Sequence, residues 1–186
     1  MIDYLFKIKR NLLPFIRGVF YRLLYSLRGN IRIGEKTRIN KGCDFVFHPG
    51  CKCELGCGSL VGKHTTLAVL RSGSLMIGKG VGIGSGNQFV CHGEIKIGDN
   101  TIFGPNVLVY DHNHLYDVKY GVNKVKYEIG EVSIGCNCWI GANVVILMNV
   151  HIGDNCVVGA GSIVTKDIPN NSIAVGNPAR CINKIQ

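Results

Sequence analysis

Aliphatic side chains recur every six residues through the C-terminal half of the chain. From 134 to 164 the recurring residue is always Ile or Val, and the next residue is usually small. The residues are Ile134, Ile140, Ile146, Ile152, Val158 and Val164. A period of six matches neither the 3.6-residue helical turn nor the simple alternation of a strand. It predicts coils of three short strands, in which the aliphatic residue points inward and the following glycine permits the corner.

The same period occurs earlier in the chain, in three shorter runs. These runs are Ile33, Ile39 and Phe45, then Ile77, Ile83 and Phe89, then Ile97, Phe103 and Val109. Since three hexads make one coil, residues 31–168 predict about six or seven coils, stacked as parallel strands at about 4.8 Å per layer. The expected fold class is therefore all-β, a parallel β-helix. HPGCKCELGCGSL at 48–60 breaks the period, and the pattern predicts no structure for it.

Two further segments are expected at the ends of the stack. In residues 1–30, apolar residues return at steps of four and three, which predicts an amphipathic helix. They are Leu12, Ile16, Phe20, Leu23 and Leu27. Asn11 is a candidate helix cap, with Pro14 in the first turn. The helix is expected to pack on its own domain or a neighbouring subunit, or to lie on an anionic membrane; residues 169–186 are expected to form a capping tail.

Positive charge is concentrated at the N-terminus. The chain carries a formal net charge of +9, and residues 1–32 contribute seven Lys or Arg against the single acid Asp3. This balance predicts an anionic surface as partner for residues 1–28, and the absence of any nucleic-acid motif argues against nucleic acid. The longest charge-free run there, 11–16, is too short for a membrane span or a secretory signal. We therefore expect a cytoplasmic protein, with peripheral membrane contact as an open alternative.

The nine cysteines are expected to be thiols at the reducing potential of the cytoplasm. Cys51, Cys53 and Cys57 lie close together, but their spacing is not the paired arrangement of a structural zinc site. Most other cysteines occupy repeat positions that favour a small buried side chain. The sequence therefore predicts buried thiols and no metal.

Three motifs in the repeat region indicate a family. They are WIGANVVI at 139–146, GAGSIVTKDIP at 159–169 and VGNPAR at 175–180. Together they resemble the left-handed parallel β-helix acyltransferases, in particular the maltose/galactoside O-acetyltransferase-like branch, which includes polysaccharide O-acetyltransferases. The resemblance implies a left-handed β-helix. It also implies transfer of an acetyl group from acetyl-CoA to a sugar hydroxyl, here expected in cell-surface polysaccharide biosynthesis.

The stretch VYDHNHLYDVKY at 109–120 interrupts the repeat and contains two histidines. By the resemblance, His114, nine residues after Pro105, falls on the catalytic histidine, which acts as general base on the acceptor hydroxyl. Asp111 and His112 are acceptor-side candidates. Asp111 and Asp117 are both possible partners that fix the tautomer of the base. The loop from about 113 to 131 is expected to leave the coils and to close a cleft.

The resemblance also implies a binding strip for acetyl-CoA. Trp139 would wall the site beside the thioester, and the backbone N–H of Ala142 would hold the oxyanion. Arg180 would bind the 3′-phosphate. The pantetheine arm and the nucleotide would contact Ala160, Thr165 and Lys166. Similar enzymes are homotrimers with active sites between subunits, which is the assembly expected here.

The acceptor side departs from the galactoside and maltose enzymes. Positions that hold sugar hydroxyls in those enzymes fall on Gly84 and His92, so a different glycosyl hydroxyl is expected. Three alternatives stay open: N-acetylation of an amino sugar or an antibiotic on the same fold, a non-catalytic solenoid scaffold, and a zinc enzyme with His92, His112 and His114 as ligands.

Overall fold

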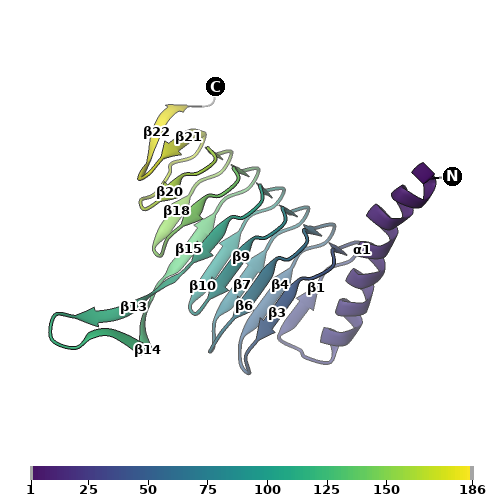
Figure 1. Ribbon diagram of the computed structural model, residues 1–186, viewed down its shortest axis with the longest axis horizontal. Helices are drawn as coiled ribbons and strands as arrows, with labels where there is room; N and C mark the ends of the chain where they lie inside the picture. Colours follow the sequence, from purple (N-terminus) through teal and green to yellow (C-terminus); the bar gives the residue numbers. More distant parts are fainter. Residues whose placement is uncertain (1, 185–186) are drawn as a thin grey trace.

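The computed structural model describes residues 2–184, with side chains placed for residues 11–184. Residue 1 of the expected helical segment and residues 185–186 of the expected tail lie outside the described residues. One helix, α1 (Ile2–Ser26), lies across the N-terminal end of a stack of coils, and the C-terminal strands lie at the opposite end (Figure 1).

The strands of the stack form three faces. The first face comprises β1 (Ile31–Ile33), β4 (Lys52–Leu55), β7 (Ser74–Ile77), β10 (Glu94–Ile97), β15 (Glu131–Ile134) and β18 (Val150–Ile152). The second comprises β2 (Arg38–Ile39), β5 (Leu60–Val61), β8 (Gly82–Ile83), β11 (Ile102–Phe103), β16 (Trp139–Ile140), β19 (Val157–Val158), β21 (Ser172–Gly176) and β22 (Ala179–Lys184). The third comprises β3 (Asp44–Phe47), β6 (Thr66–Val69), β9 (Gln88–Cys91), β12 (Leu108–Tyr110), β17 (Val145–Ile146) and β20 (Ile163–Val164).

Each strand pairs in parallel with the strand at the same place in the next coil. Ile102 pairs with Trp139, for example, and Trp139 with Val157. Strand β21 extends the second face beyond the sixth coil, and β22 turns back to pair with it antiparallel. The expectation of an all-β parallel β-helix with about six coils and a helix near the N-terminus is therefore confirmed.

The predicted six-residue positions form the core. On the second face they make one buried column, with relative exposures of 0–4%. Its members are Ile39, Val61, Ile83, Phe103, Ile140 and Val158. Burial of each such side chain contributes roughly 1.5–3 kcal/mol of hydrophobic free energy, and the same spacing repeated over three faces gives one continuous core.

The early break in the period has a simple structural cause. Paired residues are 22 positions apart between the first two coils, as in Ile31 and Cys53, but 18 apart later, as in Val132 and Val150. The additional residues lie at one corner, between the third face and the next first face, as residues 48–51 and 70–73. Residues 92–93 and 111–130 occupy the same corner. We call these four segments the insertion edge.

The glycines that follow the inward aliphatic residues do not serve the role expected of them. Gly34, Gly56 and Gly78 have no positive φ; a Cβ on Gly34 or Gly56 would instead overlap the backbone of the next coil. The left-handed residues of these corners come two positions later, and many are asparagines, such as Asn137 and Asn155. The glycines therefore permit close stacking of coils, and the turn itself is made elsewhere.

Helix α1 begins earlier than expected. It starts at Ile2, so Asn11 is not its cap and Pro14 lies in its interior. Pro14 and Gly18 are buried against the first coil, and a Cβ on Gly18 would overlap the carbonyl of Thr37. Close contact with the coil compensates for the backbone hydrogen bond that a proline removes from a helix.

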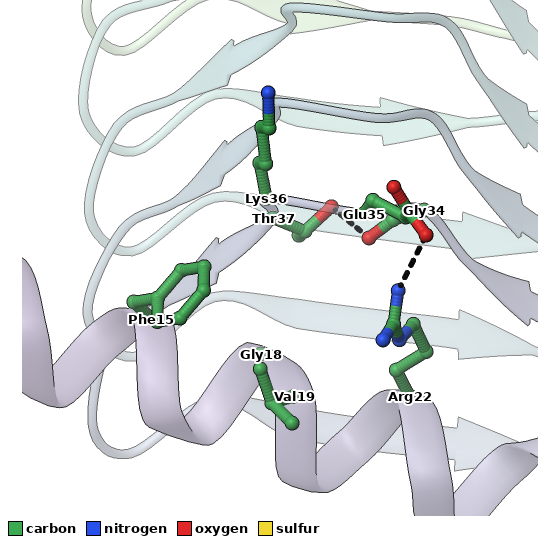
Figure 2. Close-up of a pocket in the computed structure, with 8 residues that line it drawn as sticks. All are labelled: Phe15, Gly18, Val19, Arg22, Gly34, Glu35, Lys36 and Thr37. Atoms are coloured by element: carbon green, nitrogen blue, oxygen red, sulfur yellow. Dashed lines mark hydrogen bonds and ion pairs between the residues drawn. The ribbon is translucent and has the colours of Figure 1, made fainter.

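The contact between α1 and the first coil leaves a cavity of about 200 Å³ (Figure 2). Phe15, Gly18, Val19 and Arg22 line it from the helix, and residues 34–37 line it from the coil. Arg22 forms an exposed ion pair with a carboxylate of the coil, at 3.3 Å. The cavity lies at the N-terminal end of the stack, far along the chain from the histidines at 112 and 114.

The stacking role of the corner glycines predicts a stability difference between two substitutions. Gly56→Ala places a methyl group against the backbone of Gly78, so we expect it to lower the free energy of unfolding by about 1–3 kcal/mol. Gly29→Ala is the control, because an added Cβ there meets no atom within 4 Å. Denaturant unfolding of both variants measures the difference; equal stability would contradict the close-stacking account.

Candidate functional site

The interruption of the repeat is an antiparallel hairpin at the insertion edge. It consists of β13 (His112–Asp117) and β14 (Gly121–Ile129) and stands away from the coils (Figure 1). Gly121 supplies the positive φ of the turn, and Asp117 accepts hydrogen bonds from two backbone N–H groups at the tip. The base closes where the N–H of Gly130 donates to the carbonyl of Asp111 at 2.8 Å.

His114 lies on β13, and its ring is oriented by the opposite strand. Its Nδ1 is 3.0 Å from the backbone carbonyl oxygen of Asn123. Because a carbonyl only accepts hydrogen bonds, Nδ1 must carry the proton, and Nε2 of the neutral ring is then left with its lone pair. The residue is exposed. His114 therefore presents an oriented proton acceptor to the outside of its own chain.

His112, two residues earlier, has a different environment. Its Nδ1 is 3.1 Å from a carboxylate oxygen of Asp111, and only 12% of its side chain is exposed. Asp111 is fully buried and also accepts hydrogen bonds from the backbone N–H groups of His92 and Gly93. The pair Asp111–His112 therefore ties the root of the hairpin to the preceding coil.

The two carboxylates considered as partners of His114 are both engaged elsewhere. Asp111 binds His112 and the corner at His92, whereas Asp117 binds the backbone of the hairpin tip. The backbone carbonyl of Asn123 takes the role that either carboxylate was expected to fill. Sequence reasoning could not find this partner, because a backbone acceptor has no residue signature and depends on the register of the hairpin.

An aromatic cluster packs around the hairpin. Tyr127 of β14 lies opposite His114, with ring centroids 4.5 Å apart, and its ring centroid is 4.6 Å from that of His92. The rings of His92 and His112 stack at 3.9 Å. Arg71, from an earlier corner of the insertion edge, lies over the Tyr127 ring and donates to the carbonyl of Val125. Neither Tyr127 nor Arg71 was identified from the sequence, since they lie far apart along the chain.

The residues expected to bind acetyl-CoA lie on the last two coils and the tail. Trp139 is on the second face, with 56% of its surface exposed. Ala142 and Ala160 occupy the corner between the second and third faces, one coil apart. The other three are exposed: Thr165 and Lys166 directly follow β20, and Arg180 is the second residue of β22. Thr165 and Lys166 lie at the same corner as the hairpin, whereas Ala142 and Ala160 lie at the corner between the second and third faces.

Two backbone N–H groups in this strip have no hydrogen-bond acceptor within residues 11–184. Gly141 and Asn143 each donate a backbone hydrogen bond to a neighbouring coil, but within residues 11–184 Ala142 between them donates none. The N–H of Ala160 has the same property one coil later. Since backbone N–H groups require acceptors, a carbonyl or oxyanion lying along this corner could satisfy both.

The cysteines contribute little to a site of this kind. Cys51 and Cys53 are buried, whereas Cys57 of the same cluster is exposed. Burial raises the pKa of Cys53 to about 12 and that of Cys138 to about 11, so both remain thiols near neutral pH. Within the described part of the chain, no three His, Cys, Asp or Glu side chains are grouped as metal ligands, and His92 and His112 stack rather than converge.

Comparison with known proteins gives a family model and several relatives. The model described as bacterial transferase hexapeptide (six repeats) matches residues 131–166. Such repeats imply a left-handed winding of the coils. A galactoside O-acetyltransferase of Escherichia coli (strain K12) is 47% identical over 91 residues, which are 49% of this chain and 44% of that enzyme. The chain thus spans about half the length of the curated relatives it matches.

Solved structures extend the likeness over nearly the whole chain. A maltose O-acetyltransferase from Clostridium difficile 630 is 29% identical with a TM-score of 0.60, covering 99% of this chain and 86% of that one. A mutant of AntD, an N-acyltransferase from Bacillus cereus, in complex with dTDP and coenzyme A, has a TM-score of 0.73 at 21% identity, covering 84% of each chain. The second likeness supports the fold alone. The resemblance indicated by the three sequence motifs is confirmed.

The contacts of Tyr127 predict that it restrains the hairpin. Tyr127→Ala removes the tilted ring contacts with the histidines and the cation–π contact, so we expect amide hydrogens of residues 112–129 to exchange roughly tenfold faster. Tyr127→Phe keeps the ring and should exchange almost as slowly as the wild type. Hydrogen exchange read by mass spectrometry, with the core strands as internal reference, measures both; unchanged exchange in Tyr127→Ala would disprove the restraint.

Burial of His92 predicts a pH dependence of stability. Desolvation lowers the pKa of His92 in the folded protein, and the neighbouring His112 adds to this effect. As pH falls below about 6.5 the unfolded chain therefore binds more protons than the folded one, and the free energy of unfolding decreases, by up to about 1.4 kcal/mol per pH unit. The free energy of unfolding stops decreasing once the pH is below the pKa of His92 in the folded protein.

Denaturant unfolding between about pH 7.5 and about pH 5.5 tests this dependence. The variant His92→Asn should flatten the slope, whereas His64→Asn, at an exposed corner, should not. An equal slope in His92→Asn and the wild type would assign the pH dependence to other groups.

Proposed function

Because the chain is a hexapeptide-repeat protein with the left-handed parallel β-helix fold, we propose that it is a coenzyme A-dependent O-acetyltransferase. It moves an acetyl group from acetyl-CoA to a sugar hydroxyl. The observation that carries this proposal is His114: its Nδ1 donates to a backbone carbonyl, its Nε2 is free to accept a proton, and its ring is exposed.

Nε2 of His114 takes the proton of the acceptor hydroxyl as the hydroxyl oxygen attacks the thioester carbonyl carbon. The C=O bond becomes a C–O⁻ bond in the tetrahedral intermediate. The unengaged N–H of Ala142 would donate to this oxyanion. When the intermediate collapses, the C–S bond breaks, and the thiolate of coenzyme A takes the proton back from His114. The protein is unchanged at the end, and only the acetyl group has moved.

The donor lies along the strip on the last two coils. Ala142 and Ala160 are small, and their unengaged N–H groups would donate to the amide carbonyls of an extended pantetheine arm. Trp139 would pack beside the thioester, and Thr165 and Lys166 would contact the nucleotide end. Arg180 would bind the 3′-phosphate, because a guanidinium matches phosphate geometry. Acetyl-CoA is the acyl donor, and no step requires a metal.

A homotrimer would complete the site. The hairpin that carries His114 stands away from its own coils (Figure 1), whereas Trp139 lies on the second face and Ala142 and Ala160 lie at the next corner. A hairpin of one subunit could therefore meet the strip of the next, in a cleft that neither subunit forms alone. A cyclic trimer repeats one such head-to-tail contact between two different surfaces at each of its three interfaces.

The acceptor is proposed to be a glycan of cell-surface polysaccharide biosynthesis on the cytoplasmic side. His92 falls on an expected acceptor position, yet it is 7% exposed and stacked inside the hairpin root. A galactoside pocket built on that position is therefore not supported. The basic N-terminus favours an acceptor that is anionic or is carried at an anionic surface.

Release of coenzyme A from acetyl-CoA, with a panel of sugars, amino sugars and lipid-extract glycans, tests the proposal. We expect His114→Ala to lower kcat by about 10²–10⁴-fold while acetyl-CoA still binds, since the base contacts the acceptor hydroxyl. His112→Ala is the matched control and should retain most of the activity. Calorimetric titration with acetyl-CoA separates binding from chemistry.

Three outcomes would contradict parts of the proposal. If only His112→Ala loses activity, the general base is His112, paired with Asp111, and not His114. Acetylation of amino sugars alone would change the acceptor to an amine. If the wild-type protein does not bind acetyl-CoA, the transferase proposal is wrong and a non-catalytic scaffold is favoured.

A further inference from the structure

Helix α1 uses one face to cap the coils and leaves the other uncovered. The inner face presents Pro14 and Gly18 to the first coil, followed by Tyr21 and Tyr25. The Tyr21 ring lies 5.0 Å from that of Phe45, and Tyr25 packs edge-on to the next aromatic of β3 at 5.3 Å. The helix is therefore anchored without the apolar stripe recognised in the sequence.

The stripe itself is exposed. Relative exposures rise along it: Leu12 47%, Ile16 51%, Phe20 60%, Leu23 62% and Leu27 91%. At about 100° per residue, Ile16 and Phe20 lie roughly 200° around the helix from Gly18, which is the opposite side. Leu13 and Leu24 widen the same surface at 39% and 49%. A continuous apolar strip of this length on a protein surface marks a contact surface.

Cations accompany the stripe. Arg17 lies about 100° around the helix from Gly18, on one flank of the stripe, and Arg28 follows two residues after the helix ends at Ser26. Arg22 is paired with Glu35 of the first coil, whereas no ion pair is recorded for Arg17 or Arg28 within the described part of the chain. Residues 1–32 hold seven Lys or Arg and one acid. Two such segments repel each other, which disfavours a second copy of the helix as the covering partner.

We propose that the exposed stripe of α1 binds an anionic membrane surface, with its apolar side chains among the acyl chains and its arginines at the headgroups. An amphipathic helix with a cationic flank and a polar or anchored opposite face fits such an interface. Among the described residues, no helix is long and apolar enough to cross the membrane, so the contact is in the plane of the surface.

The contact also sets the orientation of the coils. Because α1 lies across the N-terminal end of the stack, the coils rise from the membrane with the hairpin between the fourth and fifth coils (Figure 1). At about 4.8 Å per coil, the hairpin lies about 20 Å above the helix. If the proposed acetyl transfer holds, the acceptor sugar is one carried at that height by a membrane anchor. In a trimer of parallel stacks, three helices would meet the same surface and strengthen binding.

Cosedimentation of the full chain with vesicles tests the surface. We expect binding to phosphatidylcholine vesicles that contain phosphatidylglycerol, weak binding to phosphatidylcholine alone, and release as salt is raised. The double variant Ile16→Gln, Phe20→Gln should weaken binding roughly tenfold or more, because both side chains lose apolar burial. Arg17→Gln and Arg28→Gln should each weaken it about fivefold.

Met76→Gln is the matched apolar control, because Met76 is 42% exposed on the first face, away from the helix. Lys79→Gln, at an exposed corner, is the matched charge control. Neither should change vesicle binding. Binding that is equal in the stripe variants and the controls would overturn the proposal. So would unchanged vesicle binding together with a smaller oligomer in sedimentation, since the stripe would then be a contact between copies of the chain.

The orientation has its own test in tryptophan fluorescence, because Trp139 is the only tryptophan. Vesicles with brominated acyl chains quench indoles that enter the bilayer. We expect no quenching of Trp139 and strong quenching of the added tryptophan in Leu23→Trp. Quenching of Trp139 would show that the coils lie flat on the membrane and would disprove the end-on arrangement. Both readouts are independent of acetyl transfer, so failure of the enzymatic proposal leaves them interpretable.

Discussion

The whole structure depends on hydrogen bonding between identical positions of successive coils. The strands of the six coils are only two to four residues long and are stable because neighbouring coils supply their partners. Such pairing requires every coil to have the same cross-section. The six-residue spacing of inward aliphatic residues and the glycines at close-stacking corners both follow from that requirement. An error at one corner would displace the strands of every face.

A stack built on this constraint can vary freely at only one place. All additional residues of the first coils, and the hairpin itself, leave the stack at the insertion edge, so the three faces keep their register. The aromatic cluster and Arg71 then hold the hairpin by contacts between successive insertions. Side chains carried there need their own supports, because the hydrogen-bonded coils do not position them. The carbonyl of Asn123 behind His114 is one such support.

The periodic part of the fold could be predicted because burial repeats locally, and each hexad carries its own evidence. The segment 48–60 could not, because corner insertions have no period. The helical spacing of apolar residues identified the stripe of α1 correctly, but the stripe is exposed. Pro14 and Gly18 face the first coil instead, because they allow a closer approach than leucines would. The glycines at the corners were recognised, while their physical role was assigned to the turn. The partner of His114 depends on strand register, which no residue type indicates.

The insertion edge has a consequence for how such proteins diverge. Most residues proposed to bind the donor lie on the regular coils, where changes can disturb stacking, whereas the proposed base His114 lies on a segment that the core does not use. Replacement of residues 111–130 by the hairpin of a relative would leave the inter-coil hydrogen bonds intact. Under the proposed function, the two halves of the reaction can therefore change at different rates, and one scaffold can serve many acceptors without a new fold.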